Sequence, residues 1–193
     1  MTHHQILQAA GVSVELTGEE AGKQISNLEI GWAYVDQSQF CPSLFGMAEF
    51  RKKIVKRAAI STAEVLTGPV RGRNKTHLLT GYVHNEYPPI YTMLARHSGF
   101  NSALLMRGTE GGVTPSLCKR GEFVRYWEQS KDVVVEADTS KIGIEQENRL
   151  VPIAHALMPI IDREFGPDEN NAEIAKLAAK EGLAAIEGKK FHL

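Results

Sequence analysis

Residues 76–117 alternate between short apolar runs and one amphipathic run, a pattern typical of a strand, a helix and a second strand. The first run, residues 76–83, is rich in apolar and β-branched side chains. The second, residues 102–108, has no polar alternation, which is expected of a strand buried on both faces. Two strands joined by one helix run parallel with a right-handed crossover. We therefore predict an α/β fold built on this βαβ unit.

The predicted helix of the unit has prolines in its first turn and ends near Gly99. Its apolar stripe consists of Ile90, Met93, Leu94 and His97. Ligand sites of open α/β sheets collect at the carboxyl ends of the strands. The glycine-rich residues 107–112 follow the second strand, so we expect either an anion-binding backbone nest or a simple tight turn there.

The rest of the chain predicts further alternation of helices and strands. Thr17 and Glu20 form a capping box that starts a helix to about residue 28, and Ser61 and Glu64 have the same spacing. We expect strands at 30–35, 122–129 and 133–137, loops at 36–44 and 67–75, and helices at 45–55, 152–165 and 170–186. This order predicts one domain over residues 1–193, with a mostly parallel sheet and flanking helices.

The composition excludes several classes of protein. A net charge of −1 and a pI near 6.7 exclude a globally basic chain. No apolar run approaches the roughly 18 residues that a membrane span needs, and the polar N-terminus is not a signal peptide. We therefore expect a cytoplasmic protein without a membrane partner. No cysteine or histidine spacing predicts a metal site.

Positive charge is concentrated between residues 51 and 75, where eight basic residues face a single acidic one, Glu64. The segment thus carries a net charge of +7 in a chain whose total is −1. Such a field attracts phosphates, either of nucleic acid or of a small ligand, although a solvated helix face and loop would show the same composition. The predicted anion-binding residues are Arg51, Lys52, Lys53, Lys56, Arg57, Arg71, Arg73 and Lys75.

Several segments, in their order along the chain, resemble one family. They are residues 2–11 and 12–34, the Arg-containing segment 51–57, Leu-Thr-Gly-Pro at 66–69, and residues 76–117. Together they resemble the C-terminal α/β portion of anthranilate phosphoribosyltransferase and its paralogues, the TrpD-like group. The resemblance implies a domain like the C-terminal one of the nucleoside phosphorylase and phosphoribosyltransferase fold, incomplete at both ends. We expect either a part of a longer ancestor or a truncated reading frame.

The departures from that family concern its catalytic parts. The family's Gly-Thr-Gly-Gly-Asp pyrophosphate loop does not occur in the sequence, and Val113 and Thr114 stand where the transferases have two magnesium-binding carboxylates. The resemblance is therefore greatest to the non-catalytic, nucleic-acid-binding paralogues, and we expect no transferase activity and no cofactor. The alternative is a phosphoribosyl or glycosyl transferase that uses magnesium and whose phosphate loop lies outside this chain.

A candidate ligand pocket follows from the same resemblance, in which Arg51 matches the arginine that binds the carboxylate of the aromatic acceptor. Its other predicted members are His84, Tyr87, Arg107, Gly108, Glu110 and Gly111. Glu110 would repel a phosphate unless a metal intervened. The aromatic residues around the βαβ unit would either stack on bases or pack in the core; they are His77, Tyr82, His84, Tyr87 and Tyr91.

The predicted sheet has an open edge, since the family's first strands are missing from the sequence. An open edge exposes unpaired backbone groups that another chain can cover. We therefore expect homo-oligomerisation or association with a missing N-terminal part.

Overall fold

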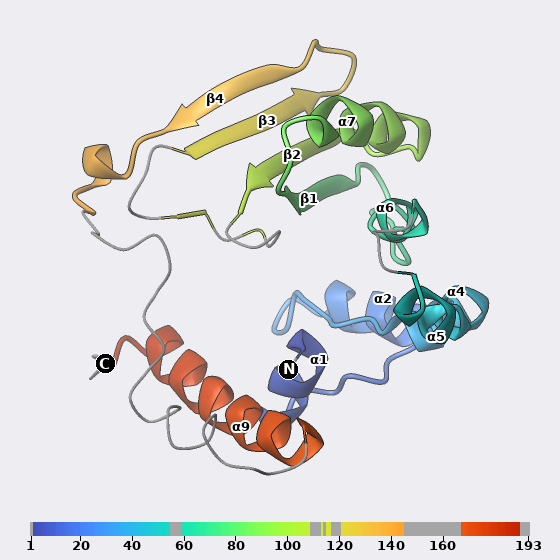
Figure 1. Cartoon of the computed structure of the whole chain (residues 1–193), viewed down its shortest axis with the longest axis vertical. Helices are drawn as coiled ribbons and strands as arrows, with labels where there is room; N and C mark the ends of the chain where they lie inside the picture. The colour runs from blue at the N-terminus through green and yellow to red at the C-terminus, as the bar shows by residue number, and fades with distance from the viewer. Residues whose placement is uncertain are drawn as a thin grey trace. The chain divides into compact units, whose positions relative to one another are not determined.

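A computed structural model describes residues 2–54, 59–108, 113, 115–116, 121–144 and 167–189. The chain divides into two compact units, residues 1–47 with 152–193 and residues 48–151. Figure 1 shows helices only in the described part of the first unit, whereas the second unit contains the sheet. Among the described residues, none of the helices combines the length and apolar character that a membrane crossing requires. The predicted single domain stays a prediction.

The first unit consists of α1 (His3–Ala9), α2 (Gly18–Ser26), α3 (Gln37–Phe40), α4 (Pro42–Gly46) and α9 (Pro167–Ile186). The predicted capping box at Thr17 and Glu20 is confirmed at the start of α2. Helix α1 packs against α9, which buries Ala175 and Ala179 (Figure 1). The sequence pattern also predicted α9, apart from its first turn.

Two predictions for the first unit were wrong. Residues 30–35 form no strand, because the chain turns at Asn27, whose side-chain oxygen accepts a hydrogen bond from the Glu29 amide at 3.0 Å. The predicted loop at 36–44 contains α3 and the start of α4. Asp36 caps α3 through the Ser38 amide, and Pro42 occupies the first turn of α4, where its missing N–H costs nothing.

The second unit begins with two short helices, α5 (Ala48–Lys52) and α6 (Ile60–Glu64). The predicted helix at 45–55 is therefore wrong, because α4 ends at Gly46 before α5 begins. The capping box predicted at Ser61 is also wrong. Ser61 lies inside α6, whose N-cap Ala59 has no side chain that could accept a hydrogen bond.

The sheet consists of β1 (His77–Tyr82), β2 (Ser102–Arg107), β3 (Gly121–Trp127) and β4 (Val133–Ala137), in the order β1-β2-β3-β4. β1 and β2 are parallel and joined by α7 (Tyr87–His97), which confirms the βαβ unit. The mostly parallel sheet was wrong, since β3 runs antiparallel to both β2 and β4. The connection between β3 and β4 is too short for a parallel crossover, so a mixed sheet results. A short 3₁₀ helix, η2 (Thr139–Ile142), follows β4.

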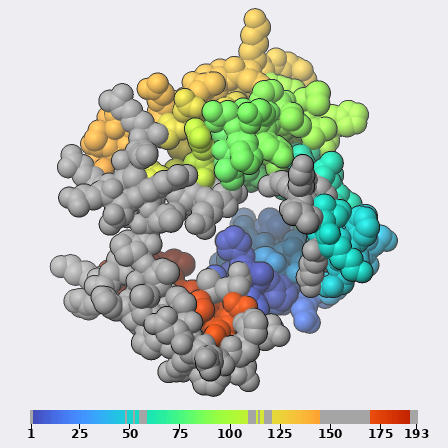
Figure 2. All heavy atoms as spheres, in the orientation of Figure 1, coloured from blue at the N-terminus to red at the C-terminus, as the bar shows by residue number. Residues whose placement is uncertain are grey.

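Helix α7 covers one face of the sheet, and in the space-filling view they form one continuous body, green to orange in Figure 2. The helix buries Pro88, Tyr91, Thr92 and Ala95, whereas Met93 of the predicted stripe is 61% exposed. The apolar stripe predicted the wrong buried side of α7, because a hydroxyl side chain such as that of Thr92 can also be buried when it has a hydrogen-bond partner. The Thr92 hydroxyl donates to the Asp132 carboxylate at 2.6 Å.

The core lies between α7 and this face of the sheet. Its buried members are Leu66, Leu78, Tyr82, Tyr91, Ala95, Phe100, Ala103, Leu105, Val124 and Tyr126. β2 was predicted to be buried on both faces, but only the face of Ala103 and Leu105 is fully covered. Leu104 and Met106 on the other face are half-buried, and Leu79, which pairs with Leu104, is exposed.

Candidate functional site

The basic loop, residues 67–75, ends in a network that fixes its position on the sheet. The Thr76 amide donates to the Asn101 side-chain oxygen and the Asn101 amide donates to the Thr76 carbonyl, both at 2.8 Å. The Thr76 hydroxyl accepts from the Gly72 amide at 3.0 Å. A Cβ at Gly72 would collide with the Lys75 carbonyl oxygen, so this tight loop requires glycine. The loop therefore presents its basic side chains from a defined backbone.

Two cations of the basic loop lie against aromatic rings. The Arg71 guanidinium is 4.1 Å from the centre of the Phe100 ring. The Lys75 ammonium is 5.3 Å from the centre of the Trp127 ring and forms an ion pair with Glu128. Asn101 links the end of the basic loop to the end of β3, because it bonds Thr76 and its carbonyl also accepts a hydrogen bond from the Glu128 amide at 2.6 Å. Cation–π contacts of this kind orient the cations without neutralising them.

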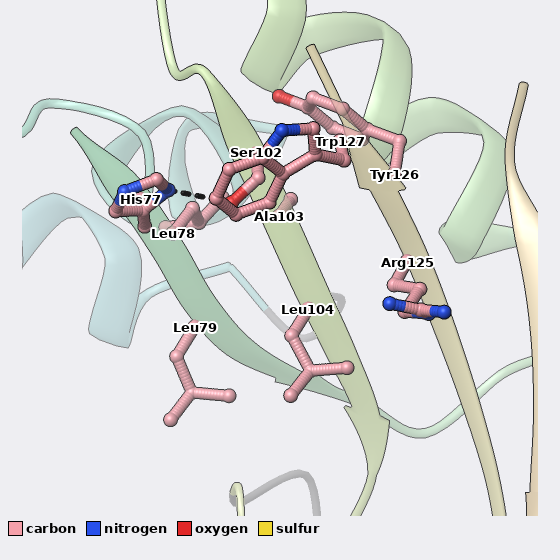
Figure 3. A pocket seen from close by; sticks show the side chains of 9 residues that line it. All are labelled: His77, Leu78, Leu79, Ser102, Ala103, Leu104, Arg125, Tyr126 and Trp127. Atoms are coloured by element: carbon pink, nitrogen blue, oxygen red, sulfur yellow. Dashed lines mark hydrogen bonds between the residues drawn. The ribbon is translucent and has the colours of Figure 1, made fainter. Parts of the chain in front are cut away.

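Three residues in register form the first row of the open sheet face: His77 on β1, Ser102 on β2 and Trp127 on β3. The rings of His77 and Trp127 are stacked, with their centres 5.3 Å apart and their planes inclined by 19°. Ser102 lies on the strand between the two residues, and its hydroxyl lies 2.7 Å from His77 Nδ1 (Figure 3). We call His77 and Trp127 the aromatic pair.

A shallow cavity of about 330 Å³ lies along this face. The row after the aromatic pair consists of Leu79, Leu104 and Arg125, which alternate with residues of the covered face (Figure 3). The cavity thus combines apolar walls with one guanidinium. It lies near the amino ends of the parallel strands, opposite to the carboxyl ends where the sequence predicted a ligand pocket.

Arg96 of α7 holds the turn that follows Trp127. Its guanidinium donates to the Glu128 carbonyl at 3.1 Å, to the Ser130 carbonyl at 2.9 Å and to the Asp132 carboxylate at 2.6 Å. The guanidinium also lies over the Tyr126 ring, 3.7 Å from its centre. Glu128 has a φ of 49°, a left-handed conformation that a non-glycine residue adopts at a cost. The Arg96 contacts stabilise that conformation and so place the Glu128 carboxylate.

The predicted basic residues do not all remain available to a phosphate. Arg51 forms an ion pair with Glu64, the acidic residue that the sequence places among them, and Lys75 pairs with Glu128. Lys53 and Arg73 are exposed and form no ion pair with any other residue in the described part of the chain. Lys56 and Arg57, and the side chain of Lys52, lie outside the described residues.

Part of the predicted ligand pocket comes together at the carboxyl end of β1. His84 and Tyr87 line a cavity of about 110 Å³ with Tyr82, Val83 and Tyr91. Burial raises the pKa of the Tyr82 phenol, and the nearby Glu122 adds to this more than Arg107 opposes it.

The remaining members of that predicted pocket are dispersed or undescribed. Arg107 is exposed and in register with Tyr82, whereas Gly108 is buried and bridges to Pro115. Arg51 does not line the cavity. Glu110 and Gly111 lie outside the described residues. The pocket therefore stays a prediction.

The sequence pattern did not reveal Trp127, Arg125, Glu128 and Arg96 as site residues. A signal was present for the first two, since Arg125 and Trp127 alternate with the apolar Val124 and Tyr126 as one face of a strand does. The partnership of Trp127 with His77 and Lys75 had no local signal. It depends on β2 lying between β1 and β3. Among the described residues, no cluster of three or more metal-binding side chains occurs.

Comparisons with known proteins connect the chain with one kind of enzyme. It is 27% identical over 106 residues to an anthranilate phosphoribosyltransferase of Cupriavidus pinatubonensis, a match that covers 55% of this chain and 27% of the relative. It is 25% identical over 105 residues to the anthranilate phosphoribosyltransferase of Delftia acidovorans, covering 54% of this chain and 29% of that relative. No family model matches the chain.

These matches support a relation to the TrpD-like group and an α/β fold. The matched part of the chain spans less than a third of the length of either curated relative. At this identity and coverage, the residues that act in the relatives are not transferred to this chain, because fold and distant similarity do not establish function.

Proposed function

We propose that this chain is a non-catalytic TrpD-like protein that binds nucleic acid, or alternatively a phosphorylated ligand, through its basic segment, residues 51–75. The observation that carries the proposal is the position of Lys75 beside the aromatic pair, with Arg71 and Arg73 on the same anchored loop. Cations next to exposed aromatic rings are typical of surfaces that bind nucleic acid through phosphates and bases. A phosphorylated small molecule would use the same cations.

The affinity in this proposal comes mainly from phosphate contacts and is independent of base sequence. Each neutralised phosphate adds about 0.7 to 0.9 to the slope of log affinity against log salt concentration. If about four cations engage, the slope is on the order of −3. Binding is local to the basic segment, since the net charge of the chain is only −1.

The experiment compares two sets of charge reversals in the full chain. Lys53→Glu with Arg73→Glu changes two exposed cations of the basic segment, and Lys176→Glu with Lys180→Glu changes two cations of α9. Affinity for a labelled oligonucleotide is measured between about 20 and 200 mM salt by fluorescence anisotropy. We expect the first pair to weaken binding and flatten the salt slope by about 1.5 to 2, and the second pair to do little. Equal losses from both pairs would contradict the proposal.

The alternative function is that of a phosphoribosyl or glycosyl transferase whose phosphate loop lies outside this chain. Its support is the similarity to two anthranilate phosphoribosyltransferases. Exposed Val113 and the following Thr114, in place of two carboxylates, argue against magnesium binding at that loop. Magnesium-dependent consumption of phosphoribosyl pyrophosphate with anthranilate by the purified chain would favour the alternative.

We further propose that the α/β unit corresponds to the C-terminal domain of the nucleoside phosphorylase and phosphoribosyltransferase fold, and that a second copy of the chain or another polypeptide covers the exposed edges of the sheet. Analytical ultracentrifugation tests self-association, and a stable monomer at micromolar concentration would count against a homo-oligomer.

A further inference from the structure

Trp127 is an exposed aromatic residue on the open sheet face. The residue is 53% exposed, although its ring is stacked on that of His77. The His77 ring is itself held by Ser102, whose hydroxyl lies 2.7 Å from Nδ1. The Lys75 ammonium lies by the Trp127 ring, and the strand register pairs Trp127 with Ser102. Because the rings are already ordered, a ligand that stacks on them loses little additional side-chain entropy.

The groups around the pair suit a nucleotide. Lys75 lies 5.3 Å from the Trp127 ring centre, and Arg125 lies two residues before Trp127 on the same face. We expect these two cations to contact the phosphates that flank a base stacked on Trp127. The cavity walls of Leu79 and Leu104 offer further apolar area beside the ring (Figure 3). An apolar protein segment would use the walls but would make no use of the Arg125 guanidinium that lines the same cavity.

The geometry of stacking favours single-stranded over double-stranded nucleic acid as the ligand. A base in a duplex already has a neighbour on each of its faces, whereas an unpaired base can place one face on a tryptophan ring. Aromatic stacking depends little on base identity, because every base has a π face.

We infer that the aromatic pair is a base-stacking subsite for single-stranded nucleic acid, with Trp127 as the platform and Lys75 and Arg125 as the phosphate contacts. The inference rests on the proposed nucleic-acid binding and adds to it a preference for unpaired strands. The basic loop supplies affinity for any phosphate backbone, and the platform adds affinity only when an unpaired base reaches it.

The experiment uses the full chain in a Trp32→Phe background, because Trp32 and Trp127 are its two tryptophans. Trp127 fluorescence is titrated with oligothymidylate, with oligouridylate and with a DNA duplex of equal length. We expect both single strands to quench Trp127. Affinities of the variants that lack Trp127 are measured by fluorescence anisotropy of labelled single strands and duplex. Trp127→Leu should weaken single-strand binding by about 5- to 150-fold and leave duplex affinity unchanged, and Trp127→Phe should retain most of the single-strand affinity. Trp32→Leu in the otherwise unchanged chain serves as the matched control, and thermal melts confirm that each variant is folded.

His77→Ala tests the subsite separately from Trp127. Loss of its ring leaves the platform mobile, so we expect a smaller but selective loss of single-strand affinity. Equal weakening of single-strand and duplex binding by Trp127→Leu, or binding without Trp127 quenching, would overturn the inference while leaving the proposed function intact. If neither single strand nor duplex binds the parent chain at low salt, the proposed function fails, and the inference fails with it.

Discussion

Lys75 and Glu128 form an ion pair between the end of the basic loop and the residue that follows β3. Both side chains are about half exposed, at 46% and 47%. A surface pair of this kind contributes about 0 to 1 kcal/mol, so a phosphate can displace the carboxylate from Lys75. The pair therefore acts as an internal competitor for any anion that approaches the aromatic pair.

Removing the Glu128 charge should strengthen nucleic-acid binding. We expect Glu128→Gln to raise affinity by up to about fivefold and to steepen the salt slope by about 0.7 to 0.9, because Lys75 becomes free to neutralise one more phosphate. Fluorescence anisotropy over a salt series measures both quantities. Glu136→Gln, an exposed carboxylate on β4, is the control. Unchanged affinity in Glu128→Gln would show that Lys75 does not contact phosphate.

Arg96 should matter for stability beyond its charge. Arg96→Ala removes hydrogen bonds to two carbonyls and to Asp132 and exposes the Tyr126 ring. We expect a loss of about 1 to 3 kcal/mol in the free energy of unfolding, since hydrogen bonds to charged groups are among the stronger ones. Urea unfolding measures it. Arg73→Ala, a matched exposed arginine, should change stability by less than about 0.5 kcal/mol.

The side of α7 that faces the core can be tested by truncation. Leu105 is fully buried opposite α7, so Leu105→Ala should destabilise the second unit by about 2 to 5 kcal/mol. Met93 is 61% exposed, so Met93→Ala should cost less than about 1 kcal/mol. Thermal or urea unfolding of the two variants compares them. Similar losses would show that the helix is rotated towards the stripe predicted from sequence.

Local patterns were sufficient to predict the βαβ unit, because each of its elements has its own apolar run and the connection length leaves one direction for the strands. Local patterns also predicted β3 and β4 as strands, but they did not predict that β3 runs antiparallel to its neighbours. The order of helices and strands predicts a parallel sheet, but the short turn after Trp127 allows only a hairpin between β3 and β4. The strand prediction for residues 30–35 is wrong because an apolar run of that length fits a strand and an irregular segment equally well.

The candidate site was predictable only in its charges. The basic residues are close together in sequence, so the sequence alone reveals their combined field. Trp127, His77 and Lys75 meet because the register of three strands aligns His77, Ser102 and Trp127. Register depends on long-range packing, which a local pattern does not encode. The ion pairs of Arg51 and Lys75 were hidden for the same reason.

The pH dependence of stability offers a test of the first unit. The Asp36 carboxylate accepts one hydrogen bond from the Ser38 amide at 2.8 Å and is paired with His4 Nδ1 at 3.0 Å. Burial by itself raises the pKa of Asp36, but the hydrogen bonds from Ser38 and His4 outweigh it and leave that pKa below its ordinary value. A carboxylate with a lowered pKa stabilises the fold above its unfolded pKa of about 3.9, and this contribution disappears as the pH falls through the folded value.

We therefore expect Asp36→Asn to reduce the free energy of unfolding at pH 7 by about 1 kcal/mol, because hydrogen bonds to a charged group contribute about that much more than neutral ones. The difference from the parent chain should shrink below about pH 4, because the parent loses the same charge there. Urea unfolding at a series of pH values between about 2.5 and 7, followed by circular dichroism, measures the difference. Glu15→Gln, at an exposed carboxylate of the same unit, is the matched control and should leave the curve unchanged. A difference that stays constant over the whole pH range would mean that Asp36 stabilises α3 by its shape and hydrogen bonding alone, and that its charge contributes nothing.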